Sequence, residues 1–343
     1  MISLADGGRG RPLLVVLRAL KLGDFLTAVP ALRALHDEFP DHRRVLAAPG
    51  WLAPLAKHAG SIDALSPTPG LVPLDPRLAD PEVAVDLHGR GPGSQPLLLA
   101  LRPRRLIAFA HPEVPATAGG PKWRRSEHEV ARWCRLLVES GIPADPGRLD
   151  LATPARTVPA WVKGATLIHP GAASAARRWP ATRYAAVARA EQRRGREVVV
   201  TGGPGEADLA TRTGRLGAVP PDRVVFQGLG LLDLLALVAS AGRVVCGDTG
   251  VAHVATAVGT PSVVLFGPVP PGQWGPPADR PWHRPLWAGR RGDPHGATVD
   301  AGLLRISPDQ VITALEELPC RAGGAGKAGA PSVVRAPTVA SVT

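Results

Sequence analysis

Aromatic residues and cysteine are scarce in this sequence of 343 residues. Phe, Trp and Tyr together make up 4% of it, and the three cysteines, Cys134, Cys246 and Cys320, lie far apart with no CxxC pair among them. An odd number of widely spaced cysteines indicates neither a disulfide framework nor a zinc site, and it suits a reducing compartment. Because the arginines are scattered and not interleaved with aromatic side chains, a surface that stacks nucleic-acid bases is not expected, and we predict no nucleic-acid partner.

Long apolar runs are missing as well. No run approaches the roughly 18 residues that a membrane-spanning helix needs. The first residues also lack the charged segment, apolar stretch and cleavage site of a secretory signal. We therefore expect a cytoplasmic protein, and the sequence leaves open a peripheral contact with a membrane.

Lysine is rare, with 5 Lys against 35 Arg, yet the formal net charge is +11. Residues 319–343 contribute +3 of that charge and contain no acidic residue. The positive field of the remaining chain could steer an anionic substrate such as a nucleotide diphosphate. Arginines that simply face water account for the same charge, so this observation favours no single function.

The hydrophobic residues, 45% of the chain, are mostly Leu, Val and Ala, which suits buried parallel strands covered by helices. In the first half we expect strands at 13–17, 44–48, 83–87 and 105–109, and helices at 24–39, 52–58, 97–101 and 127–139. Pro30 falls inside the first of these helices, as a kink or a helix start. In the second half we expect strands at 165–169, 197–201, 223–226, 243–246 and 262–266, and helices at 181–193, 206–216, 231–240, 251–258 and 308–318. This alternation predicts an α/β protein with parallel sheets.

A proline-rich stretch separates the two halves. Residues 143–163 contain four prolines and break the periodicity, so we place a linker at 151–164 between an N-terminal domain at 1–150 and a C-terminal domain at 165–318. Residues 319–343 are rich in Gly, Ala, Pro, Ser and Val without periodicity, and we expect this tail to be disordered.

Ligands of parallel sheets bind at the carboxyl ends of the strands, where helix N-termini present free N–H groups. Four strand-to-helix junctions in this sequence have an unusual composition. In the first, Gly23 permits a tight turn, and Asp24 would project from the start of the helix. The alternative for Asp24 is an ordinary helix-capping residue.

The second junction carries groups suited to a pyrophosphate. It runs from His169 through Gly171 to Ser174 and is followed by Arg177 and Arg178, which add two guanidinium groups to the backbone donors. A surface loop with solvated arginines and a packed His169 is the alternative.

The third and fourth junctions are also rich in small residues. Gly203 lies in a glycine-rich turn before Glu206, which could bind ribose hydroxyls or simply stabilise a helix N-terminus. The turn lacks the GxGxxG spacing of dehydrogenases. In the fourth junction, Thr249 and Gly250 could offer N–H groups to phosphate between Asp248 and His253, although a capping aspartate and a buried histidine would give the same pattern. The loop at 266–276 could close over a ligand.

The order and spacing of these segments resemble glycosyltransferase family 9, the ADP-heptose:lipopolysaccharide heptosyltransferase family. The resemblance rests on Gly23-Asp24 with Pro30, on His169-Pro170-Gly171 with a following Arg-Trp-Pro, and on Asp248-Thr249-Gly250 with His253 and the later Phe266-Gly267-Pro268. It covers roughly residues 13–318 and is strongest over 231–276.

The resemblance implies a GT-B fold, in which two Rossmann-like domains face a cleft and the C-terminal domain holds the donor. It implies an inverting transfer without a metal or other cofactor, with Asp24 as general base. Thr249, Gly250 and His253 would contact the donor and its diphosphate, Glu206 the ribose, and Asp248 a sugar hydroxyl. The resemblance also implies that the donor is an ADP-sugar that carries heptose or a related sugar.

One position departs from the family pattern. The family usually has a lysine two residues before the tryptophan, where this chain has Arg177. Arginine keeps the charge but differs in reach and geometry, which bears on how the donor is placed. The acceptor stays open among a glycan, a lipid-linked saccharide and a small molecule. A sugar-nucleotide-binding protein without turnover and a GT-B sugar-nucleotide epimerase are the alternative functions.

Overall fold

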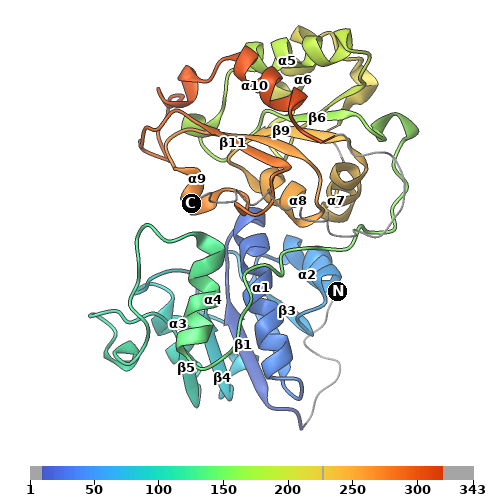
Figure 1. Ribbon diagram of the computed structural model, residues 1–343. Coiled ribbons are helices and arrows are strands. Elements are labelled where there is room, and N and C mark those ends of the chain that lie inside the picture. Colours follow the sequence, from blue (N-terminus) through green and yellow to red (C-terminus); the bar gives the residue numbers. More distant parts are fainter. Residues whose placement is uncertain (1–9, 226–227, 320–343) are drawn as a thin grey trace, which may run out of the picture.

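The computed structural model describes residues 10–225 and 228–319, which form two α/β halves, one above the other in Figure 1. The first half contains β1 (Leu13–Leu17), α1 (Leu22–Glu38), β2 (Arg43–Ala48), α2 (Ala53–Ala59), β3 (Ala64–Pro67), β4 (Val83–Asp86), α3 (Gln95–Leu99), β5 (Arg105–Ile107) and α4 (Glu129–Glu139). Its strands are all parallel and follow the order β3-β2-β1-β4-β5. The strand order therefore reverses between β1 and β4.

The second half contains β6 (Thr166–His169), α5 (Ala181–Arg193), β7 (Val198–Thr201), α6 (Ala207–Leu216), β8 (Val224–Val225), α7 (Leu231–Ser240), β9 (Arg243–Gly247), α8 (Gly250–Ala257), β10 (Ser262–Phe266), α9 (Pro271–Trp274), β11 (His283–Trp287) and α10 (Pro308–Glu316). This sheet is also parallel, in the order β11-β10-β9-β6-β7-β8. Its order reverses between β6 and β9. Both sheets thus have the doubly wound topology that places ligands at such a reversal.

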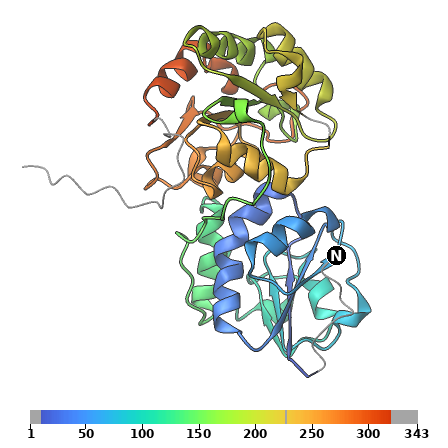
Figure 2. The same cartoon turned by 90° about the vertical axis from the view of Figure 1, so that its right-hand side faces the viewer.

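Buried apolar side chains cover both faces of each sheet. One continuous cluster includes residues of α1, α2 and α4 in the first half and of α7 and α8 in the second, so the core runs through the junction between the halves. A second cluster packs α5 and α10 on the other face of the second sheet. Figures 1 and 2 both show the start of α1 reaching the second half beside α8. The junction is therefore a packed contact between these two helices.

The predicted α/β class with parallel sheets is confirmed. Helix α1 begins at Leu22 and continues past Pro30, which is buried inside it. Two short strands were not expected, β3 and the edge strand β11. Both contain a proline, Pro67 and Pro285, and neither contains a long β-branched run. Proline is tolerated at an edge because one side of the strand needs no partner.

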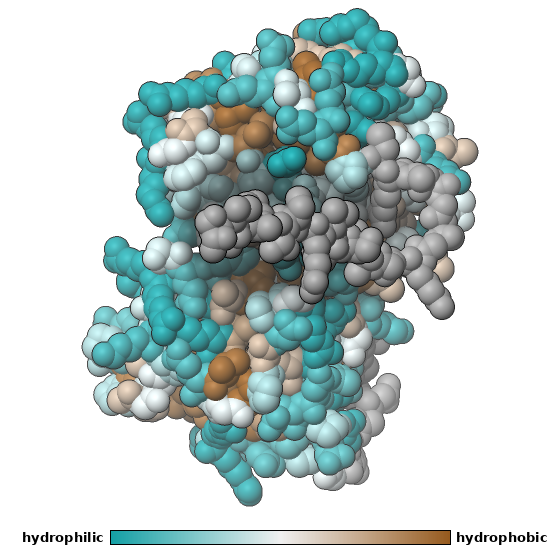
Figure 3. Space-filling model, in the orientation of Figure 1, coloured by the Kyte–Doolittle hydropathy of each residue, from teal (hydrophilic) through white to brown (hydrophobic). Residues whose placement is uncertain are grey.

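The proline-rich stretch at 143–163 contains no helix or strand apart from a short 3-10 turn, Ala160–Val162. The domain limits that we place around it remain a prediction. The predicted disordered tail lies outside the described residues except for Pro319, and residue 226 of an expected strand lies outside them too. None of the helices in the described part of the chain has the length and apolarity needed to cross a bilayer. On the face shown in Figure 3, hydrophobic residues form patches among hydrophilic ones.

Candidate active site

The first part of the site is the start of α1, which follows β1 and carries Asp24. Asp24 lies in the first turn of α1, and its carboxylate accepts a hydrogen bond from the backbone N–H of Lys21 at 3.2 Å. The side chain is 24% exposed, so it is neither buried in the core nor fully solvated. Asp24 also stabilises the start of α1, because it caps a backbone N–H there and an acid in the first turn interacts favourably with the helix dipole. Both roles are compatible with this position.

The Asp-Thr-Gly turn of the second half lies directly opposite. A Cβ atom on Gly23 would stand 2.8 Å from Cδ2 of His253 and 3.7 Å from the Cα of Gly250. A Cβ on Gly250 would in turn stand 3.0 Å from Leu22. The two glycines therefore allow the N-termini of α1 and α8 to approach each other closely. The turn before α1 and the turn before α8 form one site from two distant parts of the chain.

Asp248 is the buried acid of this site. Burial raises the pKa of its carboxyl group, the nearby guanidinium of Arg177 opposes that shift, and the charge of Asp24 adds to it. Arg177 lies 3.5 Å from the Asp248 carboxylate, and its guanidinium also donates to the Asp248 carbonyl at 3.4 Å. The structure thus brings together three predicted site residues, Asp24, Asp248 and Arg177. Thr249 is the N-cap of α8, and its side chain makes no capping hydrogen bond.

His253 faces the first half from inside α8. Burial is the main cause that lowers its pKa to about 4, and neighbouring His128 adds to the shift. The ring packs edge-on against Trp274 with centroids 6.1 Å apart. At neutral pH His253 is therefore uncharged, and it can exchange hydrogen bonds with a ligand but supplies no cation to a phosphate.

His169, the last residue of β6, and Glu206, in the loop after the neighbouring strand β7, form a pair at the carboxyl ends of these strands. The Glu206 carboxylate accepts from the Gly203 N–H at 2.7 Å and lies 3.5 Å from Nε2 of His169. A Cβ on Gly171 would overlap this carboxylate, so a larger residue there would require the Glu206 side chain to move. His169 is buried, which lowers the pKa of its ring, and its Nδ1 lies 3.1 Å from the Thr201 hydroxyl.

Ser174 and Arg178 are each held by a hydrogen bond to a backbone carbonyl. The Ser174 hydroxyl donates to the Pro294 carbonyl at 2.6 Å, and Nε of Arg178 donates to the Ala172 carbonyl at 2.9 Å. The first bond ties the loop between β6 and α5 to the segment after β11, and the second lies within that loop. The bond from Nε leaves the other N–H groups of the Arg178 guanidinium available to a ligand.

Sequence reasoning missed the groups at the switch point of the first sheet. Asp86 ends β4 and is completely buried, and this burial raises the pKa of its carboxyl group to about 6. It accepts hydrogen bonds from the Ser94 hydroxyl at 2.6 Å and from the His88 backbone N–H at 2.9 Å. The available signal was the Asp-Leu-His-Gly run that begins with the last residue of the strand, since its composition resembles that of the four junctions chosen.

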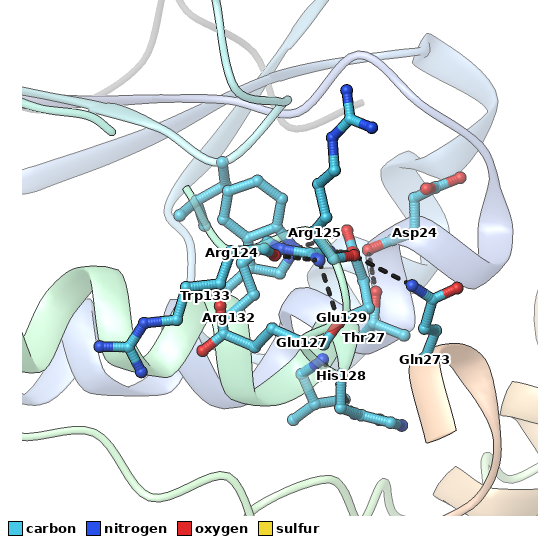
Figure 4. Close-up of polar contacts among 12 residues, drawn as sticks. Asp24, Thr27, Arg124, Arg125, Glu127, His128, Glu129, Arg132, Trp133 and Gln273 are labelled. Carbon is cyan, nitrogen blue, oxygen red and sulfur yellow. Dashed lines mark hydrogen bonds and ion pairs between the residues drawn. The ribbon is translucent and has the colours of Figure 1, made fainter. Parts of the chain in front are cut away.

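Sequence reasoning also missed how the two halves are fastened. Nε2 of His128 donates to the Gly275 carbonyl at 2.9 Å, and the Gln273 side chain donates to the Arg125 carbonyl at 3.0 Å. The Gly275 carbonyl and the Gln273 side chain both belong to the loop around α9, which we expected to close over a ligand. Figure 4 shows the Gln273 side chain of the second half reaching the backbone of Arg125 in the first half.

Among the described residues, no group of three or more His, Cys, Asp or Glu side chains is arranged to hold a metal ion. The positive charge at the junction comes from Arg18, Arg177 and the N-termini of α1 and α8.

Comparison with known proteins finds similarity to one glycosyltransferase family. Residues 121–285 match the family model "Glycosyltransferase family 9 (heptosyltransferase)". The chain resembles glycosyltransferase family 9. Over 128 residues, 36% of this chain and 36% of the relative, it is 33% identical to lipopolysaccharide heptosyltransferase 3 of Escherichia coli. The aligned stretch therefore spans only about a third of that curated relative.

Solved structures extend the likeness to most of the chain. The ADP-heptose lps heptosyltransferase II of E. coli superimposes with a TM-score of 0.70 and 18% identity, over 88% of this chain and 97% of that one. A family 9 glycosyl transferase from Veillonella parvula gives a TM-score of 0.71 and 20% identity, over 89% and 96%. These similarities confirm the predicted GT-B fold with two Rossmann-like domains.

Proposed function

We propose that this chain is a glycosyltransferase that moves a sugar from a nucleotide-diphosphate donor to an acceptor hydroxyl. The family 9 match over 121–285 and the E. coli relative support this class of reaction. The finer proposal is an inverting, metal-independent transfer of heptose or a related sugar from an ADP-linked donor. The acceptor is a hydroxyl of a glycan, a lipid-linked saccharide or a small molecule.

One observation carries this proposal. Asp24 and the Asp-Thr-Gly turn come from separate domains, yet a Cβ on Gly23 would be only 3.7 Å from the Cα of Gly250. Asp24, the residue after Gly23, is therefore close to the N-terminus of α8, and its charge acts on Asp248 in the same turn. We place the diphosphate of the donor at this helix N-terminus. This is the arrangement that an attack by an acceptor hydroxyl on a donor sugar requires.

The proposed mechanism uses the chain's own groups. Asp24 removes the proton of the acceptor hydroxyl as its oxygen attacks the anomeric carbon. Negative charge then develops on the departing diphosphate. The N–H groups at the start of α8 and the guanidinium of Arg177 stabilise that charge, because both are already oriented toward the junction. Asp248 and Glu206 accept hydrogen bonds from donor hydroxyls, and His169, Gly171, Ser174, Arg178 and Gly203 form the surrounding loops.

The first test is a thermal-shift screen of ADP, UDP, GDP and their sugars with the purified protein. A ligand at 100 times its dissociation constant should add about 2.7 kcal/mol to the free energy of unfolding. The donor that gives the largest shift then enters a transfer assay with saccharide acceptors, and NMR of the product reports its anomeric configuration. Inverted configuration, with transfer persisting in a chelator, is expected. Donor binding without transfer to any acceptor, or conversion of the donor without an acceptor, would contradict the proposal.

A further inference from the structure

Arg18 is a buried cation directly below the candidate base. Its side chain is 1% exposed, and its Nε donates to the backbone carbonyl of Asp24 at 2.5 Å. The same guanidinium lies 4.0 Å from the Asp24 carboxylate, donates to the Thr27 hydroxyl at 3.1 Å and also donates to the Leu87 carbonyl. Since Leu87 directly follows β4, Arg18 joins the two loops at the switch point of the first sheet. Its position fixes the start of α1.

A buried arginine needs a counter-charge, because the free energy cost of an unpaired buried ion amounts to several kcal/mol. Glu129, the first residue of α4, supplies it: its Oε1 accepts from Arg18 at 3.3 Å. The same oxygen accepts from the Trp133 indole at 2.8 Å, and Oε2 accepts from Arg132. The Arg18 guanidinium also lies 4.8 Å from the centroid of the Trp133 ring. Figure 4 shows Glu129, Arg132 and Trp133 on α4 and Asp24 on the neighbouring helix α1.

The start of α4 is held from the second domain as well. His128, next to Glu129, bonds the Gly275 carbonyl at 2.9 Å, and Gln273 bonds the Arg125 carbonyl at 3.0 Å. Glu129 therefore sits in a chain of contacts that begins on the donor side and ends at the Asp24 backbone. None of these contacts requires Glu129 to touch a substrate.

We propose that Glu129 is a positioning residue for the transfer reaction, which holds Asp24 in its reactive place through Arg18. This inference rests on the proposed function. Removal of the charge of Glu129 leaves Arg18 and Arg132 facing one another across an uncharged group, and Arg18 then shifts. The carboxylate of Asp24 moves with it, while the donor-binding loops after β6 and β9 keep their own contacts.

Glu129→Gln is the direct test. A glutamine keeps the shape of the side chain but has one oxygen and one NH2 group. The guanidinium of either Arg18 or Arg132 must then face an NH2 donor in place of a carboxylate oxygen. We expect kcat to fall roughly 10- to 100-fold, because displacements of about 1 Å in a reactive group have effects of this size. The donor dissociation constant and the donor KM should stay within about twofold of the wild-type values.

Glu127→Gln is the matched control. Glu127 lies two residues earlier and binds Arg135 with both oxygens, at 2.7 and 2.8 Å, but has no contact with Arg18. This variant loses a comparable carboxylate–guanidinium pair, so any general weakening of α4 affects both proteins. Its kcat should match that of the wild type.

A double-mutant cycle tests whether Glu129 acts through the base. If it does, Glu129→Gln adds nothing to the loss caused by Asp24→Asn, whereas independent effects would multiply. Should Glu129→Gln fail to fold, Arg18→Lys takes its place, since it keeps the buried charge but loses the fork of donors, and the same selective fall in kcat is expected.

Equal kcat values for Glu129→Gln and Glu127→Gln, or multiplicative effects in the cycle, would overturn the positioning role while leaving the glycosyltransferase proposal intact. A wild-type protein that transfers no sugar would overturn both.

Discussion

Gly23 is the position where a single methyl group should disturb the junction of the two domains. A Cβ there would lie 2.8 Å from Cδ2 of His253, about 0.6 Å inside the 3.4 Å at which ordinary contact begins. His253 has little room to move, because its ring packs against Trp274. The helix propensity of alanine would add at most about 1 kcal/mol to the free energy of unfolding. Overpacking costs about 1–3 kcal/mol, so the clash should prevail.

We expect Gly23→Ala to lower the free energy of unfolding by about 1 kcal/mol, which corresponds to a fall of roughly 2–4 °C in Tm. The rate of sugar transfer should fall by about tenfold or more, since Asp24 moves away from the Asp-Thr-Gly turn. Thermal unfolding and a transfer assay on the same preparation measure both effects.

Gly272→Ala is the control, because Gly272 also lies in a helix and a Cβ there would meet nothing within 4 Å. That variant should keep the stability and the turnover of the wild type. A Gly23→Ala protein that is more stable than the wild type and fully active would refute the close approach of α1 and α8 as a requirement for activity.

Two further predictions concern charge. Arg177→Lys should weaken donor binding by about tenfold, because lysine keeps the charge but loses the planar fork that can hold a phosphate and Asp248 together. Calorimetric titration with the donor measures this effect, and an unchanged dissociation constant would remove Arg177 from the donor site. Burial is the main cause that lowers the pKa of His283 to about 3. Between pH 6.5 and 3 the unfolded chain therefore binds a proton at this histidine that the folded protein does not bind. The free energy of unfolding is highest above pH 6.5 on this account, and it falls by on the order of 4–5 kcal/mol as the pH falls toward 3. Denaturant unfolding at several pH values should therefore show a shallower loss for His283→Asn than for the wild type between pH 6.5 and 4, and parallel curves would contradict the shifted pKa.

Much of the fold could be predicted because its central strands are continuous apolar runs. Strand β1 and helices α5 and α7 have the expected limits, and Ser307 caps α10 with its hydroxyl, as its place before Pro308 indicates. The edge strand β11 has no such run, because exposure on one side and pairing on the other permit Arg284 and Pro285 there.

The candidate site was predictable only as separate loops. Glycine and acidic residues after each strand indicated where ligands bind, but the sequence could not pair Glu206 with Gly171 or Gly23 with His253, since these contacts depend on how distant segments pack. The bond between Arg18 and Glu129 spans 111 positions of the chain. A buried ion pair of this kind leaves no local pattern, because each residue taken alone looks like an ordinary surface charge.

The most direct test of the proposed mechanism is Asp24→Asn, with donor binding and sugar transfer measured on the same protein. Asparagine keeps the shape of the side chain and can still accept from the Lys21 N–H, but it cannot take a proton from the acceptor hydroxyl. We predict that transfer falls roughly 100- to 10,000-fold while the donor dissociation constant stays close to the wild-type value. Transfer at the wild-type rate by Asp24→Asn would contradict the assignment of Asp24 as the general base.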